Sequence, residues 1–216
     1  MDRGRRRDAF RPTPRPPRIG VFGGTFDPPH RGHVAVAADV ADALELDRVL
    51  WIPARVSPFK QDGAAAPLDA RLEMVRAAVT ADPRFEVEPM ELERPGPSYT
   101  VETLEALRRR FPDAELHLII GADQFEEFAR WRSPDTIVSL ARLAVMNRGD
   151  ASAEPVADAV ARAVPGIADA TTFVRVRPVD VSSTDVRVAV GQGAEPDGLV
   201  PEEVARIIGS RGLYRT

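Results

Sequence analysis

Cysteine is absent from the 216 residues, and only 6% of them are aromatic. Without a thiol the chain has no disulfide, no thiolate metal site, no cysteine-bound iron–sulfur cluster and no cysteine nucleophile, and a reducing cytoplasm is the expected location. No stretch approaches the roughly 18 consecutive apolar residues of a membrane helix, so we expect no membrane partner. The remaining composition, 44% hydrophobic and 29% charged, is typical of a globular protein with one core.

Lysine is nearly absent as well, since Lys60 is the single lysine among 29 basic residues. The net charge of −4 hides an asymmetry, because the first 18 residues hold seven Arg against two Asp and the rest of the chain is acidic. A nucleic-acid-binding body usually has the opposite sign, so we expect no nucleic-acid partner. The sequence leaves the oligomeric state open, and a homo-oligomer is compatible with it.

The Arg- and Pro-rich residues 1–17 contain too little apolar surface to offset the entropy of ordering. We expect them to be a disordered, solvated extension, with weak binding to a polyanion as the alternative. They lack the apolar middle region of a secretory signal. Residues 18–216 are expected to form a single domain.

Apolar segments alternate with segments of helical spacing along the rest of the chain. Strands are expected at 18–24, 47–54, 85–92, 115–123, 142–148 and 171–179, and helices at 32–46, 68–82, 100–111, 123–140, 156–164, 182–192 and 201–210. Continuously apolar strands separated by such helices indicate parallel pairing with helices on both faces. We therefore predict an α/β fold, a doubly wound, Rossmann-like parallel sheet that binds ligands at the carboxyl ends of its strands.

The first of these strand ends carries the segment GGTFDPPHRGH. Gly23 and Gly24 allow a tight turn and a close approach to the backbone. His30 and His33 follow three residues apart at a helix start, where free N–H groups and the helix dipole favour an anion. Zinc binding by His-x-x-His is an alternative, but no third ligand is evident.

The last strand end carries VSSTDVR. Ser183 and Thr184 stand at a helix start and Arg187 one turn later, so their hydroxyl and guanidinium groups are candidates for binding phosphate. A helix cap is the alternative role for the hydroxyls.

The middle of the chain adds further candidates. Lys60 lies in the loop after the second strand, where a mobile ammonium suits a phosphate. Tyr99 and Thr100 precede a helix, with Thr100 a candidate N-cap whose neighbouring amides suit a carboxylate. Asp123 at a strand end is a candidate for ribose hydroxyls, and Trp131 with Tyr99 for stacking on a flat ring.

Two of these motifs, in this order, resemble a known superfamily. GGTFDPPHRGH is similar to the H-x-G-H signature of the nucleotidyltransferases, in the longer form of the adenylyltransferase branch, and SSTDVR is similar to their second motif. The dinucleotide motif G-x-G-x-x-G and the phosphate loop G-x-x-x-x-G-K-[ST] are both missing. Together with S-Y-T, G-A-D…W and the final G-L-Y, residues 18–214 resemble bacterial nicotinate mononucleotide adenylyltransferases.

The resemblance implies roles for particular residues. Catalytic roles fall to His30, His33, Lys60 and Arg187. The ATP site takes in Gly23, Gly24, Thr25, Phe26, His30, His33, Lys60, Gly121, Asp123, Arg148, Ser183, Thr184 and Arg187. The nicotinate mononucleotide site takes in Tyr99, Thr100, Trp131 and Arg132. Arg132 departs from the family, whose members often have an aromatic residue there.

The implied reaction joins ATP and nicotinate mononucleotide to give deamido-NAD and pyrophosphate. Mg²⁺ would arrive on the ATP phosphates, so no metal ligand is expected among the side chains. The alternatives are a related adenylyltransferase acting on the amide mononucleotide or on phosphopantetheine, and a nucleotide-sensing module without turnover.

Overall fold

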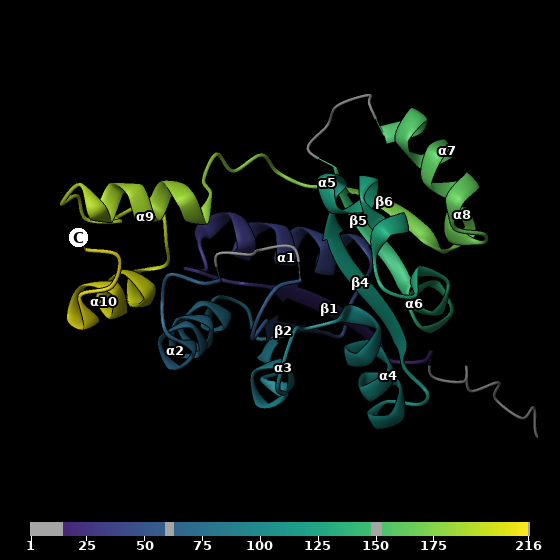
Figure 1. Ribbon diagram of the computed structural model, residues 1–216, viewed down its shortest axis with the longest axis horizontal. Helices are drawn as coiled ribbons and strands as arrows, with labels where there is room; N and C mark the ends of the chain where they lie inside the picture. The colour runs from purple at the N-terminus through teal and green to yellow at the C-terminus, as the bar shows by residue number, and fades with distance from the viewer. Residues whose placement is uncertain (1–14, 59–62, 148–152, 216) are drawn as a thin grey trace, which may run out of the picture.

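The structure is a computed structural model, which describes residues 15–58, 63–147 and 153–215, with side chains described outside 153–157. Six strands form one sheet in the order β3-β2-β1-β4-β5-β6, and every neighbouring pair is parallel (Figure 1). The strands are β1 (Arg18–Gly24), β2 (Arg48–Pro53), β3 (Phe85–Val87), β4 (Glu115–Gly121), β5 (Arg142–Asn147) and β6 (Thr171–Arg175). The predicted doubly wound sheet is confirmed, and its strand order reverses between β1 and β4.

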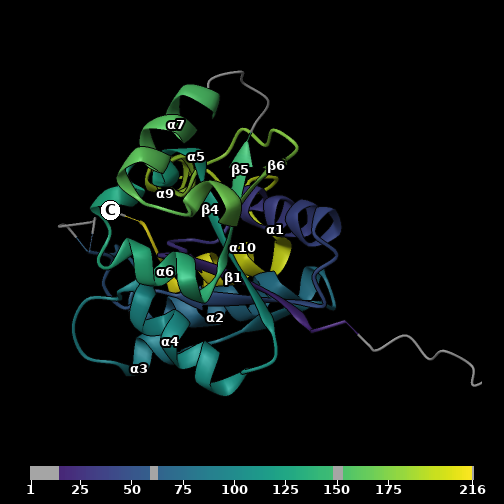
Figure 2. The same cartoon turned by 90° about the vertical axis from the view of Figure 1, so that its right-hand side faces the viewer.

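The longer helices connect the strands and cover both faces of the sheet (Figures 1 and 2). They are α1 (Arg31–Ala43), α2 (Leu68–Ala78), α4 (Thr100–Arg110), α6 (Pro134–Leu140), α7 (Ala153–Ala163), α9 (Ser183–Gly191) and α10 (Glu202–Arg211). Shorter helical segments are α3 (Met90–Glu93), α5 (Ala122–Glu126) and α8 (Ile167–Ala170), with the 3-10 turns η1 (Val79–Ala81) and η2 (Phe128–Arg130).

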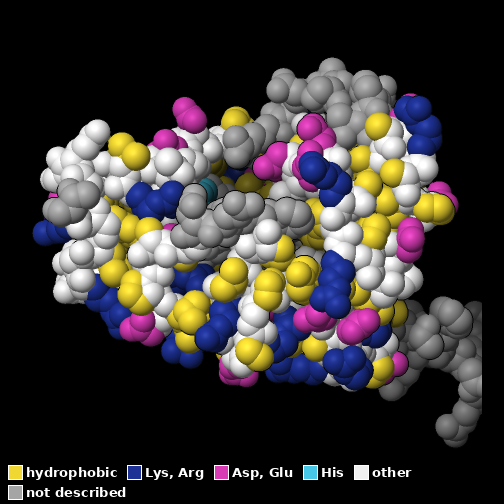
Figure 3. Space-filling view, in the orientation of Figure 1, with side chains coloured by type: hydrophobic (Ala, Val, Ile, Leu, Met, Phe, Trp, Pro, Cys, Tyr) yellow, Lys and Arg dark blue, Asp and Glu magenta, His cyan; other side chains and the backbone are white. Residues whose placement is uncertain are grey.

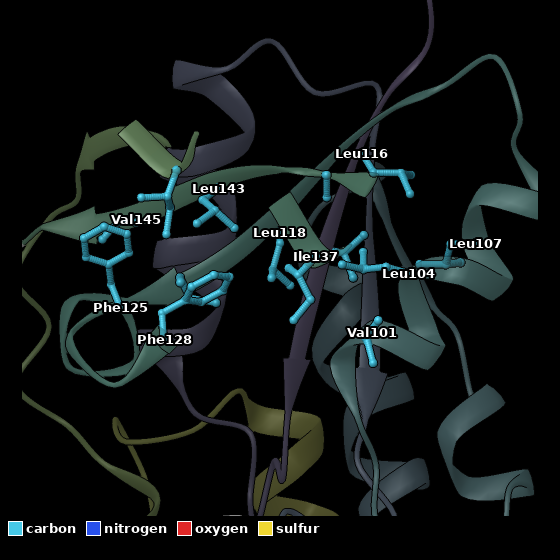
Figure 4. Packing of buried hydrophobic residues seen from close by; sticks show 14 of the residues in the cluster. Val101, Leu104, Leu107, Leu116, Leu118, Phe125, Phe128, Ile137, Leu143 and Val145 are labelled. Atoms are coloured by element: carbon cyan, nitrogen blue, oxygen red, sulfur yellow. The ribbon is translucent and has the colours of Figure 1, made fainter. Parts of the chain in front are cut away.

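Side chains along each strand point alternately to the two faces of the sheet, which divides the core into two layers. In β1, Ile19 and Val21 face one layer and Phe22 faces the other, as the two-residue period of a strand requires. The first layer packs α4, η2 and α6 against β4 and β5, and Figure 4 shows its side chains meeting from these elements. The second layer packs α1 and part of α2 against β1 and β2.

A third apolar cluster joins α2 to α9 and α10. Val186 and Val190 of α9 and Val204 and Ile208 of α10 are buried there with Met74 of α2. Figure 1 shows α9 and α10 at the same end of the molecule, beyond the sheet. This cluster brings the carboxyl-terminal helices to the edge where β1 ends.

Several expected boundaries shift by a few residues, and two expected elements differ in kind from the structure. The strand expected at 85–92 ends at Val87, and α3 follows, because Pro89 at the helix N-cap turns the chain. The single helix expected at 123–140 is interrupted after η2, where Ser133 has a left-handed conformation with φ 54° and Pro134 starts α6. This interruption leaves Trp131 in an extended conformation instead of inside a helix.

The first strand, β1, begins at Arg18, and Arg15 just before it bonds to both carboxylate oxygens of Asp47. Residues 1–14 lie outside the described part of the chain, so the disordered extension and the division at residue 18 stay predictions. Among the described residues, no helix is long and apolar enough to cross a membrane.

Candidate functional site

A cleft of about 300 Å³ opens at the carboxyl ends of β1, β2 and β4, next to the point where strand order reverses. One end of the cleft is made by the turn after β1 and by α1 and α9, and the other by the segment before α4 and the break after η2. Its polar lining groups at these two ends are Thr25, His33, Ser57, Glu91, Ser98, Thr100, Thr103, Gln124 and Ser183. On the face shown in Figure 3, a histidine side chain is visible in a hollow beside basic side chains.

The turn from β1 to α1 is tightly packed. Phe26 is buried with a left-handed φ of 47°, and its ring lies 5.1 Å from the ring of His33 in an edge-on contact. A Cβ at Gly24 would stand 3.0 Å from the Phe26 ring. Glycine at position 24 therefore leaves room for the ring that supports His33.

The two imidazoles start α1. His30 is the N-cap, and its backbone N–H donates to Nδ1 of His33 at 3.2 Å. The two rings lie 3.7 Å apart between centroids, and a Cβ at Gly32 would come within 2.9 Å of the His30 ring. His33 lines the cleft, whereas His30 is 8% exposed and stacks behind it.

Asp27 ties this turn to distant parts of the chain. Its carboxylate accepts hydrogen bonds from the N–H groups of Ala65 and Ala66, at 2.6 and 3.1 Å, and from the Tyr214 hydroxyl at 2.8 Å. Burial, reinforced by Asp27, raises the pKa of Tyr214 far above its usual range, so the hydroxyl remains a donor. Asp27 thus joins the end of the loop before α2 to the carboxyl-terminal residues.

A fully buried arginine of α2 holds the same turn through hydrogen bonds to backbone carbonyls. Arg71 of α2 is 0% exposed and donates to the carbonyls of Thr25 and Ala54, at 2.7 and 2.8 Å. Burial lowers the pKa of its guanidinium, and the charge of Asp27 opposes that effect. Arg71 therefore fixes the ends of β1 and β2 relative to each other.

The start of α9 reaches the turn after β1. Ser183 Oγ donates to the Pro28 carbonyl at 2.8 Å, and Arg187 donates to the Asp27 carbonyl at 2.8 Å and to Thr184 Oγ1 at 3.2 Å. Ser182 caps the helix through a reciprocal pair of bonds with Asp185. The structure thus brings together Ser183, Thr184 and Arg187 with the segment that precedes the two histidines, although more than 150 residues separate them in the sequence.

The other end of the cleft lies at the start of α4. Tyr99, not Thr100, is the N-cap of α4, so the expected cap was wrong by one residue, and no side chain caps the helix. Thr100 and Trp131 line both the cleft and an adjoining hollow of about 260 Å³. The guanidinium of Arg132 lies 4.5 Å above the Tyr99 ring in that hollow, and donates to Glu102 at 3.0 Å.

A buried acid lies beside these residues. Glu91 is 7% exposed and lines the cleft. It accepts a hydrogen bond from Thr103 at 2.6 Å, and Arg94 donates to the same threonine hydroxyl. Burial raises the pKa of the Glu91 carboxyl, whereas the hydrogen bonds from Thr103 and Ser98 and the charge of Arg94 oppose this shift.

Some expected residues are not brought into the cleft wall. Gly121 starts α5 as its N-cap, and the carboxylate of Asp123 folds back over it, but neither lines the cleft. Lys60 and Arg148 lie outside the described residues, although Pro58 on one side of the first gap lines the cleft. Gly23, Gly24, Thr25 and Phe26 line it as a continuous turn.

Glu91, Arg71 and the Asp27–Tyr214 bond were not predicted from the sequence. Arg71 carried a signal, because it occupies the buried face of a helix beside Ala70, Met74 and Val75, where an arginine needs partners. Glu91 was hidden in a segment expected to be a strand. The bond between Asp27 and Tyr214 depends on tertiary packing and has no local signal.

The described residues include no group of three or more His, Cys, Asp or Glu arranged to hold a metal ion. What the cleft offers at its first end is an imidazole, hydroxyls and backbone N–H groups at a helix start, with the Arg187 guanidinium beside them. Such donors stabilise a polyphosphate. The second end offers aromatic rings and an uncapped helix start, which suit a flat ring with an anionic group.

Comparisons with known proteins agree with this geometry. A cytidylyltransferase-like family model matches residues 21–189. A relative from Gemmatimonas aurantiaca is 44% identical, covering 92% of each chain, and one from Roseiflexus sp. is 42% identical, covering 91% of this chain and 98% of that one. Both carry the name "Probable nicotinate-nucleotide adenylyltransferase".

A solved structure shares the fold. The Plasmodium falciparum nicotinic acid mononucleotide adenylyltransferase complexed with NaAD superposes with a TM-score of 0.72 at 14% identity, covering 92% of this chain and 97% of that one. With the family model spanning most of the chain and relatives above 40% identity over nine-tenths of it, this chain belongs to the cytidylyltransferase-like family and, within it, to the nicotinate-nucleotide adenylyltransferases.

Proposed function

We propose that the protein transfers the adenylyl group of ATP to nicotinate mononucleotide, giving deamido-NAD and pyrophosphate in the biosynthesis of NAD. One observation carries this proposal. A single cleft has groups of the H-x-G-H and S-S-T-x-x-R motifs, which suit a phosphate, at one end and Thr100 with Trp131 at the other. The name shared by the relatives of this chain supports the same reaction. The cytoplasm is the location we propose for it.

ATP would occupy the end of the cleft formed by the turn after β1. Gly23 and Gly24 let the nucleotide approach the backbone, and His33 with the first N–H groups of α1 faces its phosphates. Ser183, Thr184 and Arg187 would bind the phosphates from α9. The remaining residues proposed for ATP are Thr25, Phe26, His30, Lys60, Gly121, Asp123 and Arg148.

Nicotinate mononucleotide would occupy the other end. Its ring would stack on Trp131 and Tyr99, and its carboxylate would accept hydrogen bonds from the uncapped start of α4 at Thr100. Arg132, stacked on Tyr99, adds a positive charge at the rim. These features favour an acid over the corresponding amide.

The chemistry needs little beyond alignment and charge stabilisation. The 5′-phosphate of the mononucleotide is already ionised near neutral pH, so it can attack the α-phosphorus of ATP without a general base. As the new P–O bond forms and the bond to pyrophosphate breaks, negative charge accumulates on the α-phosphoryl and leaving-group oxygens. His33, His30, Lys60 and Arg187 are proposed to stabilise that charge.

Mg²⁺ is proposed to enter as part of the nucleotide. Asp27, the carboxylate of the turn after β1, already accepts hydrogen bonds from two backbone N–H groups and a hydroxyl. It is therefore poorly suited to binding a metal. The ion would therefore be held by the ATP phosphates and water, and would supply charge neutralisation.

The test is to incubate the protein with ATP, Mg²⁺ and either nicotinate mononucleotide, its amide or phosphopantetheine, and to measure pyrophosphate. We expect release with the acid and much slower release with the other two. Preference for the amide or for phosphopantetheine would assign the protein to a related adenylyl transfer. Nucleotide binding without pyrophosphate release would make it a sensing module.

A further inference from the structure

The cleft contains a charge that the proposed reaction does not explain. Both substrates are anionic at their phosphates, and the groups that face them are donors or cations. Among the described residues that line the cleft, Glu91 is the only carboxylic acid. A buried acid in an anion-binding cleft costs binding energy unless it has a cationic partner.

Neighbouring residues fix the position of the Glu91 carboxyl. Thr103, on the buried face of α4, donates to Glu91 Oε1 at 2.6 Å. The guanidinium of Arg94 lies 3.9 Å from Oε1, near enough to attract but longer than a direct hydrogen bond. The carboxyl is thus held by the Thr103 hydroxyl and only partly neutralised.

The place of Glu91 in the cleft points to its partner. Glu91, Ser98, Thr100, Thr103 and Trp131 line the end proposed for the pyridine nucleotide. In nicotinate mononucleotide the ring nitrogen is bonded to the ribose and carries a permanent positive charge. It is the only cationic group in either organic substrate, as Glu91 is the only acid of the described cleft lining.

We propose that Glu91 is a specificity-determining residue whose carboxylate pairs with the positively charged pyridinium ring of the mononucleotide. This inference rests on the proposed function, and names the group that recognises the charge of the ring. Trp131 and Tyr99 recognise its shape, and the start of α4 recognises its carboxylate. A neutral ring of the same shape would leave the Glu91 charge unpaired.

Binding of a cation favours the ionised form of the acid, so ring recognition depends on pH. The charged groups around Glu91 are Arg94 beside it, Glu102 on α4, and Arg55, which donates to the carbonyl of Leu92. As the pH rises and Glu91 ionises, preference for the charged ring should increase. The phosphate of the mononucleotide also titrates near neutral pH, so a reference compound with the same phosphate is needed.

The experiment compares nicotinate mononucleotide with its C-riboside analogue, in which a ring carbon replaces the nitrogen and the ring is neutral. Inhibition or dissociation constants of both are measured from pH 5 to 8. The wild-type protein should prefer the charged ring by about tenfold or more, increasingly so at higher pH. In Glu91→Gln, which keeps an acceptor for Thr103, this preference should fall below about threefold and become independent of pH.

Glu88→Gln is the matched control. Glu88 is equally buried, at 8% exposed, but it pairs with Arg110, accepts the N–H of Met90 and does not line the cleft. The control should keep the wild-type preference. Equal affinity of the wild type for both rings, or an unchanged preference in Glu91→Gln, would overturn the proposal. The wild-type comparison needs no variant, so equal affinity for both rings would overturn the proposal even if Glu91→Gln failed to fold. Pyrophosphate release by the wild type tests the reaction separately.

Discussion

At the scale of single residues, His33 links the fold to the proposed chemistry. Its Nδ1 accepts the N–H of His30, so hydrogen bonding at the helix start fixes the orientation of the ring. The Phe26 ring packs against its edge, and its exposed side lines the cleft. An imidazole held in this way donates to a phosphate oxygen without reorganising as charge develops.

Replacing His33 by Ala should therefore lower kcat by roughly 10²- to 10³-fold, the usual effect of losing one charge-stabilising donor. Steady-state pyrophosphate release measures the effect, and His117→Asn, a change at the opposite end of β4, serves as the control histidine. Turnover of His33→Ala near that of the wild type would contradict the proposed role.

Trp131 presents a different residue-scale test, because it is proposed to bind and not to react. Trp131→Ala should raise KM for nicotinate mononucleotide by about tenfold and leave KM for ATP nearly unchanged, since an aromatic stacking contact contributes about 1 kcal/mol or more beyond its buried area. Initial rates with each substrate varied in turn provide the measurement. An effect confined to ATP would show that the ring pocket lies elsewhere.

At the scale of elements, the site depends on turns that several helices hold in place. The turn after β1 is fixed by Arg71 from α2, by Ser183 and Arg187 from α9, and by Tyr214 beyond α10. Each helix buries an apolar face in the third cluster, so packing there sets the position of the polar groups. The cleft is thus assembled by helices that do not themselves carry the first motif.

Arg71→Met tests this dependence within α2. The change leaves the buried carbonyls of Thr25 and Ala54 without their donor, and should reduce the free energy of unfolding by about 2–4 kcal/mol. Urea denaturation provides the measurement. Arg76→Met, on the exposed side of the same helix, should change it by less than about 0.5 kcal/mol. Equal effects of the two variants would argue against the Arg71 contacts.

At the scale of the whole molecule, the carboxyl-terminal residues meet the turn after β1 at Asp27. Gly212 and Tyr214 both adopt left-handed conformations, with φ of 61° and 64°, which turn the chain back after α10. The Tyr214 hydroxyl then reaches a carboxylate 187 positions earlier. The carboxyl-terminal residues are therefore part of the support of the proposed ATP site.

Tyr214→Phe removes only that hydroxyl and leaves Asp27 with one donor fewer. The free energy of unfolding should fall by about 1–2 kcal/mol in urea denaturation. Arg211→Gln, at the end of α10, breaks exposed ion pairs with Asp69 and Glu73 of α2. It should lower the free energy of unfolding by less than about 1 kcal/mol. If Tyr214→Phe were as stable as the wild type, the bond to Asp27 would contribute nothing measurable.

His117 makes the stability of the whole molecule depend on pH. Burial lowers the pKa of its imidazole below the model-peptide value of 6.5, although Glu115 opposes the shift. Between the two pKa values the unfolded chain binds a proton that the folded protein does not. The contribution of the neutral His117 to the free energy of unfolding is therefore complete above about pH 6.5. It is lost as the pH falls through the lowered pKa of this residue.

Urea midpoints measured between pH 5 and 8 should show this loss in the wild type, and a smaller slope in His117→Gln. The difference between the two proteins isolates the imidazole from other groups whose pKa differs between the folded and unfolded chain, such as Glu91, whose raised pKa acts with the opposite sign. Identical slopes would show that His117 does not couple to folding.

The sequence alone determined that the strands pair in parallel in a doubly wound sheet, and that one motif follows the first strand and the other the last. The reason is that apolar periodicity, glycines at strand ends and paired histidines are local properties of the chain. Its prediction that the histidines and Arg187 share one site agrees with the bonds from Ser183 and Arg187 to the turn before His30. The roles of Lys60 and Arg148 stay predictions.

Only the tertiary structure decided which groups complete the cleft. Glu91 and Arg71 belong to none of the motifs, and Arg71 and Tyr214 acquire their partners from elements far away in the sequence. The break after η2, which turns Trp131 toward the cleft, also replaced an expected helix. Burial and long-range hydrogen bonding depend on how the helices pack, and a local pattern of residues does not record that packing.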